Sequence, residues 1–101
     1  MSKLTIKASQ LSSVAFWQSF NKLTGLSDLD GKATVSLYRL KRDFASEVEL
    51  LKESLSDAEE GTIKEALSAD IDFETELTLD PVDLSVNLSA DDLYQLEPLF
   101  Q

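Results

Sequence analysis

The chain has 101 residues, so we expect a single domain over 1–101. Nineteen acidic against nine basic residues give a net charge of −10, and 43% of the residues are hydrophobic, enough for a core. The lack of cysteine and histidine excludes disulfides, thiolate metal ligands and histidine-based catalysis. Because no apolar run approaches the roughly 20 residues of a membrane span and no signal peptide opens the chain, we expect a soluble protein of the cytoplasm without membrane contacts.

Charge is unevenly distributed along the chain. Residues 1–52 carry eight basic and five acidic side chains, whereas residues 53–101 carry one basic and fourteen acidic side chains. Either the two parts pair their charges in the fold, or the second part presents a negative surface, and both can hold together.

The first elements in chain order are a strand and a helix. Residues 3–8 alternate between polar and apolar side chains, which is the period of a half-buried strand. A helix with a large apolar face follows from a cap at Ser9 to about Leu23. Gly25 is placed to end this helix in a left-handed conformation.

The next element is a long helix that follows a turn at 26–31. Asp28 and Asp30 both qualify as its N-terminal cap. The helix spans about 25 residues, or roughly 37 Å. It carries one apolar stripe, made of Ala33, Leu37, Leu40, Phe44, Val48, Leu51 and Leu55. One or two further helical turns are predicted at 62–67.

The last third of the chain changes to a period of two. Residues 71–79 alternate between apolar and mostly acidic side chains and predict a strand. Residues 82–88 continue the alternation with the opposite parity, so the chain must bend or form a hairpin at Asp80-Pro81. Ser89 then caps a short helix to about Leu96.

Together these elements predict an α+β fold in the order β-α-α-β-β-α. A small two- to three-stranded antiparallel sheet packs against a long central helix and two shorter helices. We expect residues 3–8 to pair with 71–79, because Lys3 and Lys7 then face the acidic side of the second strand.

The candidate binding surface is acidic. It is formed by Asp70, Asp72, Glu74, Glu76, Asp80 and Asp83. A row of carboxylates can imitate a polyanion and bind a basic groove on another protein. The alternative is a solvated face or an edge strand whose charges prevent aggregation.

Other site classes have little support in the sequence. Without histidine no common nucleophilic triad can form, and three isolated glycines make no phosphate-binding loop. A strand spreads its carboxylates along a line, whereas calcium needs converging oxygens. The one basic cluster, residues 38–42, is a poor footprint for nucleic acid on a chain of this charge. We therefore expect no enzyme activity, cofactor, metal or direct nucleic-acid binding.

The apolar stripe of the long helix allows two arrangements. In a small domain such a stripe packs on the sheet and on the preceding helix. Because its spacing is close to a heptad repeat, it also allows a homodimer or a larger homo-oligomer.

In overall layout the chain resembles the short uncharacterised proteins encoded in tailed-phage genomes. The resemblance lies in the opening strand 3–7, the long helix 33–55 and the terminal segment 88–100, while the change of parity around Pro81 departs from it. It implies a viral or mobile-element origin and a bacterial host cell. No catalytic or binding residues follow from it.

The expected function is therefore that of a non-enzymatic acidic protein-binding module. Its partner would be a host or viral protein, and inhibition of a host or defence protein through the acidic surface is the role we expect. The alternative is a structural component of a virion or its assembly, or a homo-oligomeric adaptor, in which the long helix makes the contacts. An oligomer could also bind a small ligand between its subunits.

Overall fold

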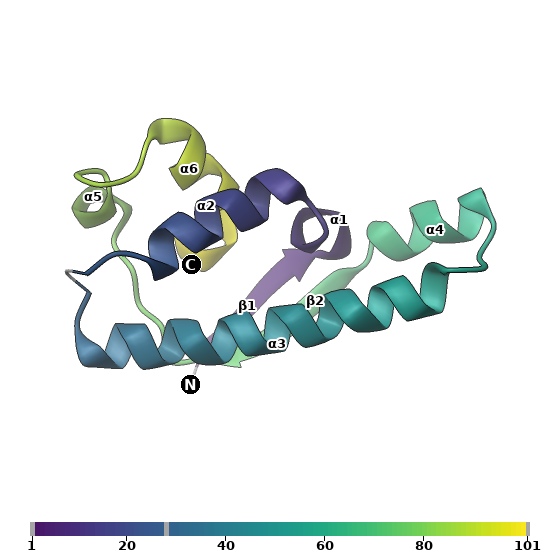
Figure 1. Cartoon of the computed structure of the whole chain (residues 1–101), viewed down its shortest axis with the longest axis horizontal. Coiled ribbons are helices and arrows are strands. Elements are labelled where there is room, and N and C mark those ends of the chain that lie inside the picture. Colours follow the sequence, from purple (N-terminus) through teal and green to yellow (C-terminus); the bar gives the residue numbers. More distant parts are fainter. Residues whose placement is uncertain (1, 28, 101) are drawn as a thin grey trace.

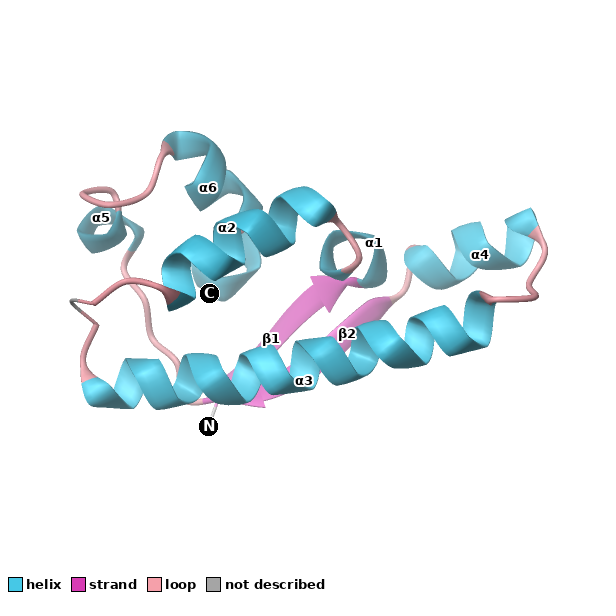
Figure 2. Cartoon of the chain, viewed as in Figure 1, coloured by secondary structure: helices cyan, strands magenta, loops and turns pink. Residues whose placement is uncertain are grey.

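The structure is a computed structural model, which describes residues 2–27 and 29–100. The long helix α3 runs along one side of the molecule. The sheet and most of the other helices lie on one face of α3 (Figures 1 and 2). The elements in chain order are β1 (Ser2–Lys7), α1 (Ala8–Leu11), α2 (Val14–Thr24), α3 (Gly31–Leu55), α4 (Glu60–Leu67), β2 (Asp70–Thr75), α5 (Pro81–Leu84), α6 (Ala90–Gln95) and the 3₁₀ helix η1 (Glu97–Phe100).

The sheet of the described chain consists of β1 and β2, which pair antiparallel as predicted. Its inner face buries Leu4 and Ile6 from β1 and Phe73 from β2. The other face carries the opposed pairs Lys3–Glu74, Thr5–Asp72 and Lys7–Asp70. The alternation of each strand thus places its apolar side on the core and its charged side outward.

Two helices replace the single helix predicted from Ser9. α1 ends at Leu11, and Ser13 begins α2 as its cap, with its hydroxyl accepting a hydrogen bond from the backbone N–H of Phe16 at 3.5 Å. The indole N–H of Trp17 donates to the carbonyl of Leu11 at 2.6 Å. Side chains therefore satisfy backbone groups at the break that a continuous helix would satisfy internally.

The long helix α3 has the predicted length of 25 residues. Its cap is Asp30, whose carboxylate accepts a hydrogen bond from the backbone N–H of Ala33 at 2.7 Å, while Asp28 lies outside the described residues. Gly25 ends α2 with φ −86°, a right-handed conformation, so the predicted left-handed cap is wrong. The helical turns predicted at 62–67 belong to α4.

Five aromatic rings form the centre of the core. Phe44 of α3 lies 4.8 Å from the ring of Phe73, 5.3 Å from Phe20, 5.9 Å from Phe16 and 6.4 Å from Trp17, between ring centroids. α2, α3 and β2 are therefore held together by one aromatic cluster. Aliphatic side chains complete it, among them Leu4, Ile6, Leu11, Leu23, Leu37, Leu40, Leu77, Leu84, Leu88, Leu96 and Leu99.

The segment after β2 differs from the prediction. The strand predicted over 71–79 ends at Thr75, and the strand predicted over 82–88 is wrong. Asp80 caps α5 by accepting a hydrogen bond from the backbone N–H of Val82 at 2.9 Å, and Pro81 occupies the first helical position. A cap followed by a proline starts a helix.

The apolar residues of this segment also fit a helical turn. Leu84 and Leu88, four positions apart, are buried, whereas Val82 and Val86 are 73% and 83% exposed. In a strand all four would share one face. The described part of the chain therefore has a two-stranded sheet, and its element order is not the predicted β-α-α-β-β-α.

The C-terminal helix α6 begins at Ser89, as predicted. Asp92 and Ser89 exchange hydrogen bonds between side chain and backbone in a capping box. The buried Asp92 carboxylate also accepts hydrogen bonds from the hydroxyl of Ser19 at 2.8 Å and the ammonium of Lys22 at 3.3 Å. This cluster joins α6 to α2.

The molecule is longer than a compact fold of its size. Its radius of gyration is 14.2 Å and its extents are 44 × 27 × 20 Å, against about 13 Å expected for the radius of 100 residues. The second half of α3 and α4 extend past the sheet as a helical hairpin (Figure 1). None of the residues of α4 is buried. Residues 46–69 are here called the α3–α4 end.

Candidate functional site

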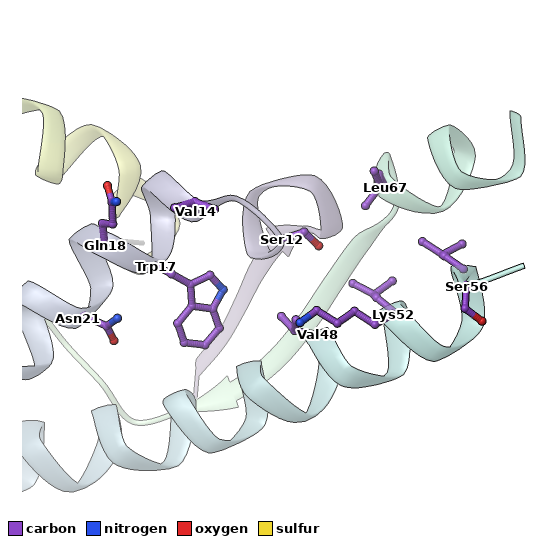
Figure 3. Close-up of a pocket in the computed structure, with 11 residues that line it drawn as sticks. Ser12, Val14, Trp17, Gln18, Asn21, Val48, Lys52, Ser56 and Leu67 are labelled. Atoms are coloured by element: carbon purple, nitrogen blue, oxygen red, sulfur yellow. The ribbon is translucent and has the colours of Figure 1, made fainter. Parts of the chain in front are cut away.

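A groove of about 790 Å³ opens between α2 and the second half of α3 (Figure 3). Its apolar lining consists of Val14, Trp17, Val48, Leu51, Leu55 and Leu67. Among its polar lining residues, Gln18 and Asn21 lie at one end and Ser56 at the other, while Ser12 lies at the turn before α2 and Lys52 on α3 (Figure 3). The groove is thus predominantly apolar, the usual character of a binding site.

The floor of the groove is the last part of the α3 stripe. Leu37, Leu40 and Phe44 are buried in the core. Val48, Leu51 and Leu55 continue the same stripe but are only half-buried, since the body of the molecule does not extend over them. Apolar surface that would gain free energy by burial therefore remains open to solvent.

Trp17 forms a fixed wall of the groove. Its indole N–H is held by the carbonyl of Leu11, and its ring makes edge contacts with Phe20 and Phe44 at 5.8 and 6.4 Å between centroids. Because these contacts fix the ring, little conformational entropy is lost when a ligand packs against it. Trp17 is also the single tryptophan of the sequence.

The surroundings of the groove are strongly acidic. The α3–α4 end carries seven acidic side chains and two lysines, Lys52 and Lys64. Glu49 and Glu53 directly follow Val48 and Lys52 on α3 and are exposed. At 100° per residue they lie about 100–160° around α3 from the floor residues, so they add to the negative charge of this end from the outer side of the helix.

The predicted acidic site residues of β2 are partly neutralised. Asp70 lies 3.6 Å from the ammonium of Lys7, and Asp72 lies 4.0 Å from that of Lys3, between charged atoms. The hydroxyl of Thr5 also donates to Asp72 at 2.7 Å. These contacts follow from the predicted strand pairing, and exposed pairs of this kind contribute little stability, about 0–1 kcal/mol each.

The other predicted acidic residues do not join them in one compact surface. Glu74 and Glu76 are exposed at the far end of β2 and just beyond it, near the first half of α3. Asp80 caps α5, and Asp83 is exposed on that helix. The series thus runs from Asp70, beside α4, to α5 at the opposite end of the molecule (Figure 1).

Basic residues gather on the first half of α3. The exposed side chains there are those of Arg39, Lys41 and Arg42, together with Tyr38. Arg42 pairs with Asp43 at 3.5 Å between charged atoms. Positive and negative charge therefore concentrate on successive halves of the same helix.

Comparison with known proteins found no matching family model, no matching curated protein and no matching solved structure. Among the described helices, none combines the length and hydrophobicity that crossing a membrane requires. Within residues 2–27 and 29–100, histidine, cysteine and acidic side chains form no group of three or more that could hold a metal ion.

The groove was not predicted from the sequence, although Val14, Trp17 and the α3 stripe were identified as apolar. The signal was the length of α3, because a helix of roughly 37 Å is longer than a domain of this size can cover. Between Leu55 and β2 the sequence also offers few apolar residues that could cover the end of the stripe, chiefly Ile63, Ala66 and Leu67.

Proposed function

We propose that the chain is a non-enzymatic protein-binding module whose groove receives an apolar segment of a partner protein. The observation that supports this proposal is the open end of the α3 stripe, bounded by the fixed ring of Trp17. Each apolar side chain that a partner covers contributes on the order of 1 kcal/mol. A few such contacts around a rigid aromatic anchor are typical of binding hot spots.

In the same proposal, negative charge supplies the long-range attraction between the chain and its partner. The acids of β2 were the expected source of this charge, but Glu76 lies beside Ser36 of α3. Ser36 precedes Val48 by twelve residues, which is about 18 Å along the helix. Charges at that distance are largely screened at physiological salt, where the Debye length is about 8 Å. We assign the steering of a partner into the groove to the acids of the α3–α4 end, with the β2 acids as a weaker contribution.

Inhibition of a host or defence protein is the role that we propose for this binding, and the resemblance to phage proteins implies that the cell is bacterial. A homo-oligomeric or assembly role is the alternative, and the uncovered stripe on α3 favours it as a candidate contact between copies. Sizing of the purified chain separates the two roles. A large closed oligomer supports the alternative, and a monomer supports the binding module.

Two adjacent leucines test the proposed site. Leu51 lines the groove, whereas Leu50 is 54% exposed and lies outside it. We expect L51D to reduce recovery of the partner at least about tenfold in a pull-down of the tagged chain from bacterial lysate, equivalent to about 1.4 kcal/mol. L50D introduces the same charge on the same helix and should leave recovery unchanged.

The comparison requires that both variants remain folded, which circular dichroism checks. Partner release at high salt is expected for a complex assisted by charge. Equal recovery with L50D and L51D would show that the partner binds elsewhere and would contradict the proposal.

A further inference from the structure

The proposed function leaves open which kind of segment enters the groove. Resting on that proposal, we infer that the occupant is an amphipathic helix of a partner protein, with an apolar face for the groove and lysine or arginine residues on its flanks. Three features of the described residues support this inference: the spacing of the floor, the character of the lining and the charge of the surroundings.

The floor residues have helical spacing. Val48, Leu51 and Leu55 stand at i, i+3 and i+7 on α3, a row of about 10 Å at 1.5 Å per residue. A partner helix with apolar residues at the same spacing can pack its ridge along this row. Trp17 then contacts the partner helix from the side of α2.

The lining also favours a segment that satisfies its own backbone. The middle of the groove is formed mainly by aliphatic and indole groups, with Ser12 and Lys52 as its polar residues, and Gln18, Asn21 and Ser56 lie toward its ends (Figure 3). An extended segment would leave most of its backbone N–H and C=O groups without partners against the aliphatic and indole part of this surface, which is costly. A helix brings its backbone hydrogen bonds with it.

The charge of the α3–α4 end selects basic flanks. This region carries seven acidic side chains against two lysines, and its exposed acids include Glu49 and Glu53 on the outer side of α3. A symmetric dimer through the groove would bring two such acidic ends together, which like-charge repulsion opposes. Charge complementarity therefore favours a basic partner over a second copy of the chain.

Lys52 is the one charged residue of the lining, and its side chain extends along α3 toward Val48 (Figure 3). Its alkyl stem can pack against an apolar partner, while its ammonium opposes a basic flank. K52Q should therefore tighten binding of a basic helix about two- to fivefold, since one repulsive charge is removed.

The inference can be tested with Trp17 as the fluorescent reporter. The probe is a designed peptide of about 14 residues, or four helical turns, made of leucine and lysine with the leucines at helical spacing. One control peptide replaces every lysine by glutamate, and another has the same leucine and lysine residues in alternation. We expect a saturable change in Trp17 emission with the helical Leu/Lys peptide, and at least about tenfold weaker binding of both controls.

Paired charge reversals locate the attraction. E49K/E53K and E74K/E76K change the net charge equally, but only the first pair lies on the α3–α4 end, next in sequence to the lining residues Val48 and Lys52. E49K/E53K should weaken binding of the Leu/Lys peptide at least about tenfold at low salt. E74K/E76K should weaken it less than about threefold, because screening reduces the effect of distant charges. L51D should remove the Trp17 response, and L50D should retain it.

The outcomes separate this inference from the proposed function. The inference of a basic helix is wrong if the Leu/Glu peptide binds as tightly as the Leu/Lys peptide, or if E49K/E53K and E74K/E76K weaken binding equally. In either case the proposal of an apolar binding groove remains. If the alternating peptide binds as tightly, the helical occupant is wrong. If the chain alone forms a dimer that L51D dissociates, a second copy occupies the groove and the inference is overturned.

Discussion

Replacement of Phe44 by alanine is expected to lower the free energy of unfolding by about 3–5 kcal/mol. The ring is fully buried and contacts four other rings from α2 and β2, so its removal leaves a cavity where three elements meet. Small domains are stable by only about 5–15 kcal/mol, which makes this loss a large share of the total. Urea unfolding followed by circular dichroism measures it.

A control for this substitution lies on the same helix. Tyr38 is 65% exposed, and Y38A should change the free energy of unfolding by less than about 0.5 kcal/mol. F44L, which retains much of the apolar volume, should lose less stability than F44A. Similar stabilities for F44A and Y38A would contradict the position of the aromatic cluster.

The second large effect is expected at Asp92. The D92A variant should lose about 2–3 kcal/mol of unfolding free energy, because the buried hydroxyl of Ser19 loses its acceptor and the cap of α6 is weakened. D91A is the matched control, since Asp91 is exposed in the same turn of α6. Chemical unfolding of both variants tests the assignment, and equal losses would show that only the helix dipole is involved.

The contribution of Asp92 should also depend on pH. The hydrogen bond from Ser19 lowers the pKa of Asp92, burial opposes this effect, and hydrogen bonds from Ser89 and Lys22 lower the pKa further. A carboxyl whose pKa is lower in the folded state stabilises the fold above its unfolded pKa, and this stability is lost as the pH falls through the folded pKa. The stability difference between the native chain and D92N should therefore be constant above about pH 4 and decrease below it.

The fold prediction was accurate where a sequence pattern fitted one structure, and it was wrong where the pattern fitted two. α3 rests on a long apolar stripe and the pairing of β1 with β2 on opposed charges, and these predictions are confirmed; of the two predicted caps of α3, Asp30 is the one that the structure shows. The strand prediction for residues 82–88 was wrong because the same four apolar residues also fit a helical turn. In that turn Leu84 and Leu88 lie on one side. There the cap at Asp80 and Pro81 determined the structure.

The site was less accessible from the sequence than the fold. From the sequence, Trp17 and Leu51 were expected to be core residues. Only the three-dimensional arrangement shows that α3 extends beyond the rest of the molecule. The bonds from Ser19 and Lys22 to Asp92 connect residues about 70 positions apart, and no local pattern signals such a contact. Asp72 and Glu74 of the predicted acidic surface were correctly placed on a strand, but Glu76 lies beyond its end, and the position of Asp83 on α5 depended on the turn at Asp80.

Amide hydrogen exchange, with the chain alone and bound to the protein that it retains from lysate, tests the central claim most directly. We predict slower exchange at residues 11–18 and 48–56, which form the wall and floor of the groove, and unchanged exchange at 81–95. Slower exchange confined to 70–76 would place the partner on the outer face of the sheet and would contradict the groove as the binding site.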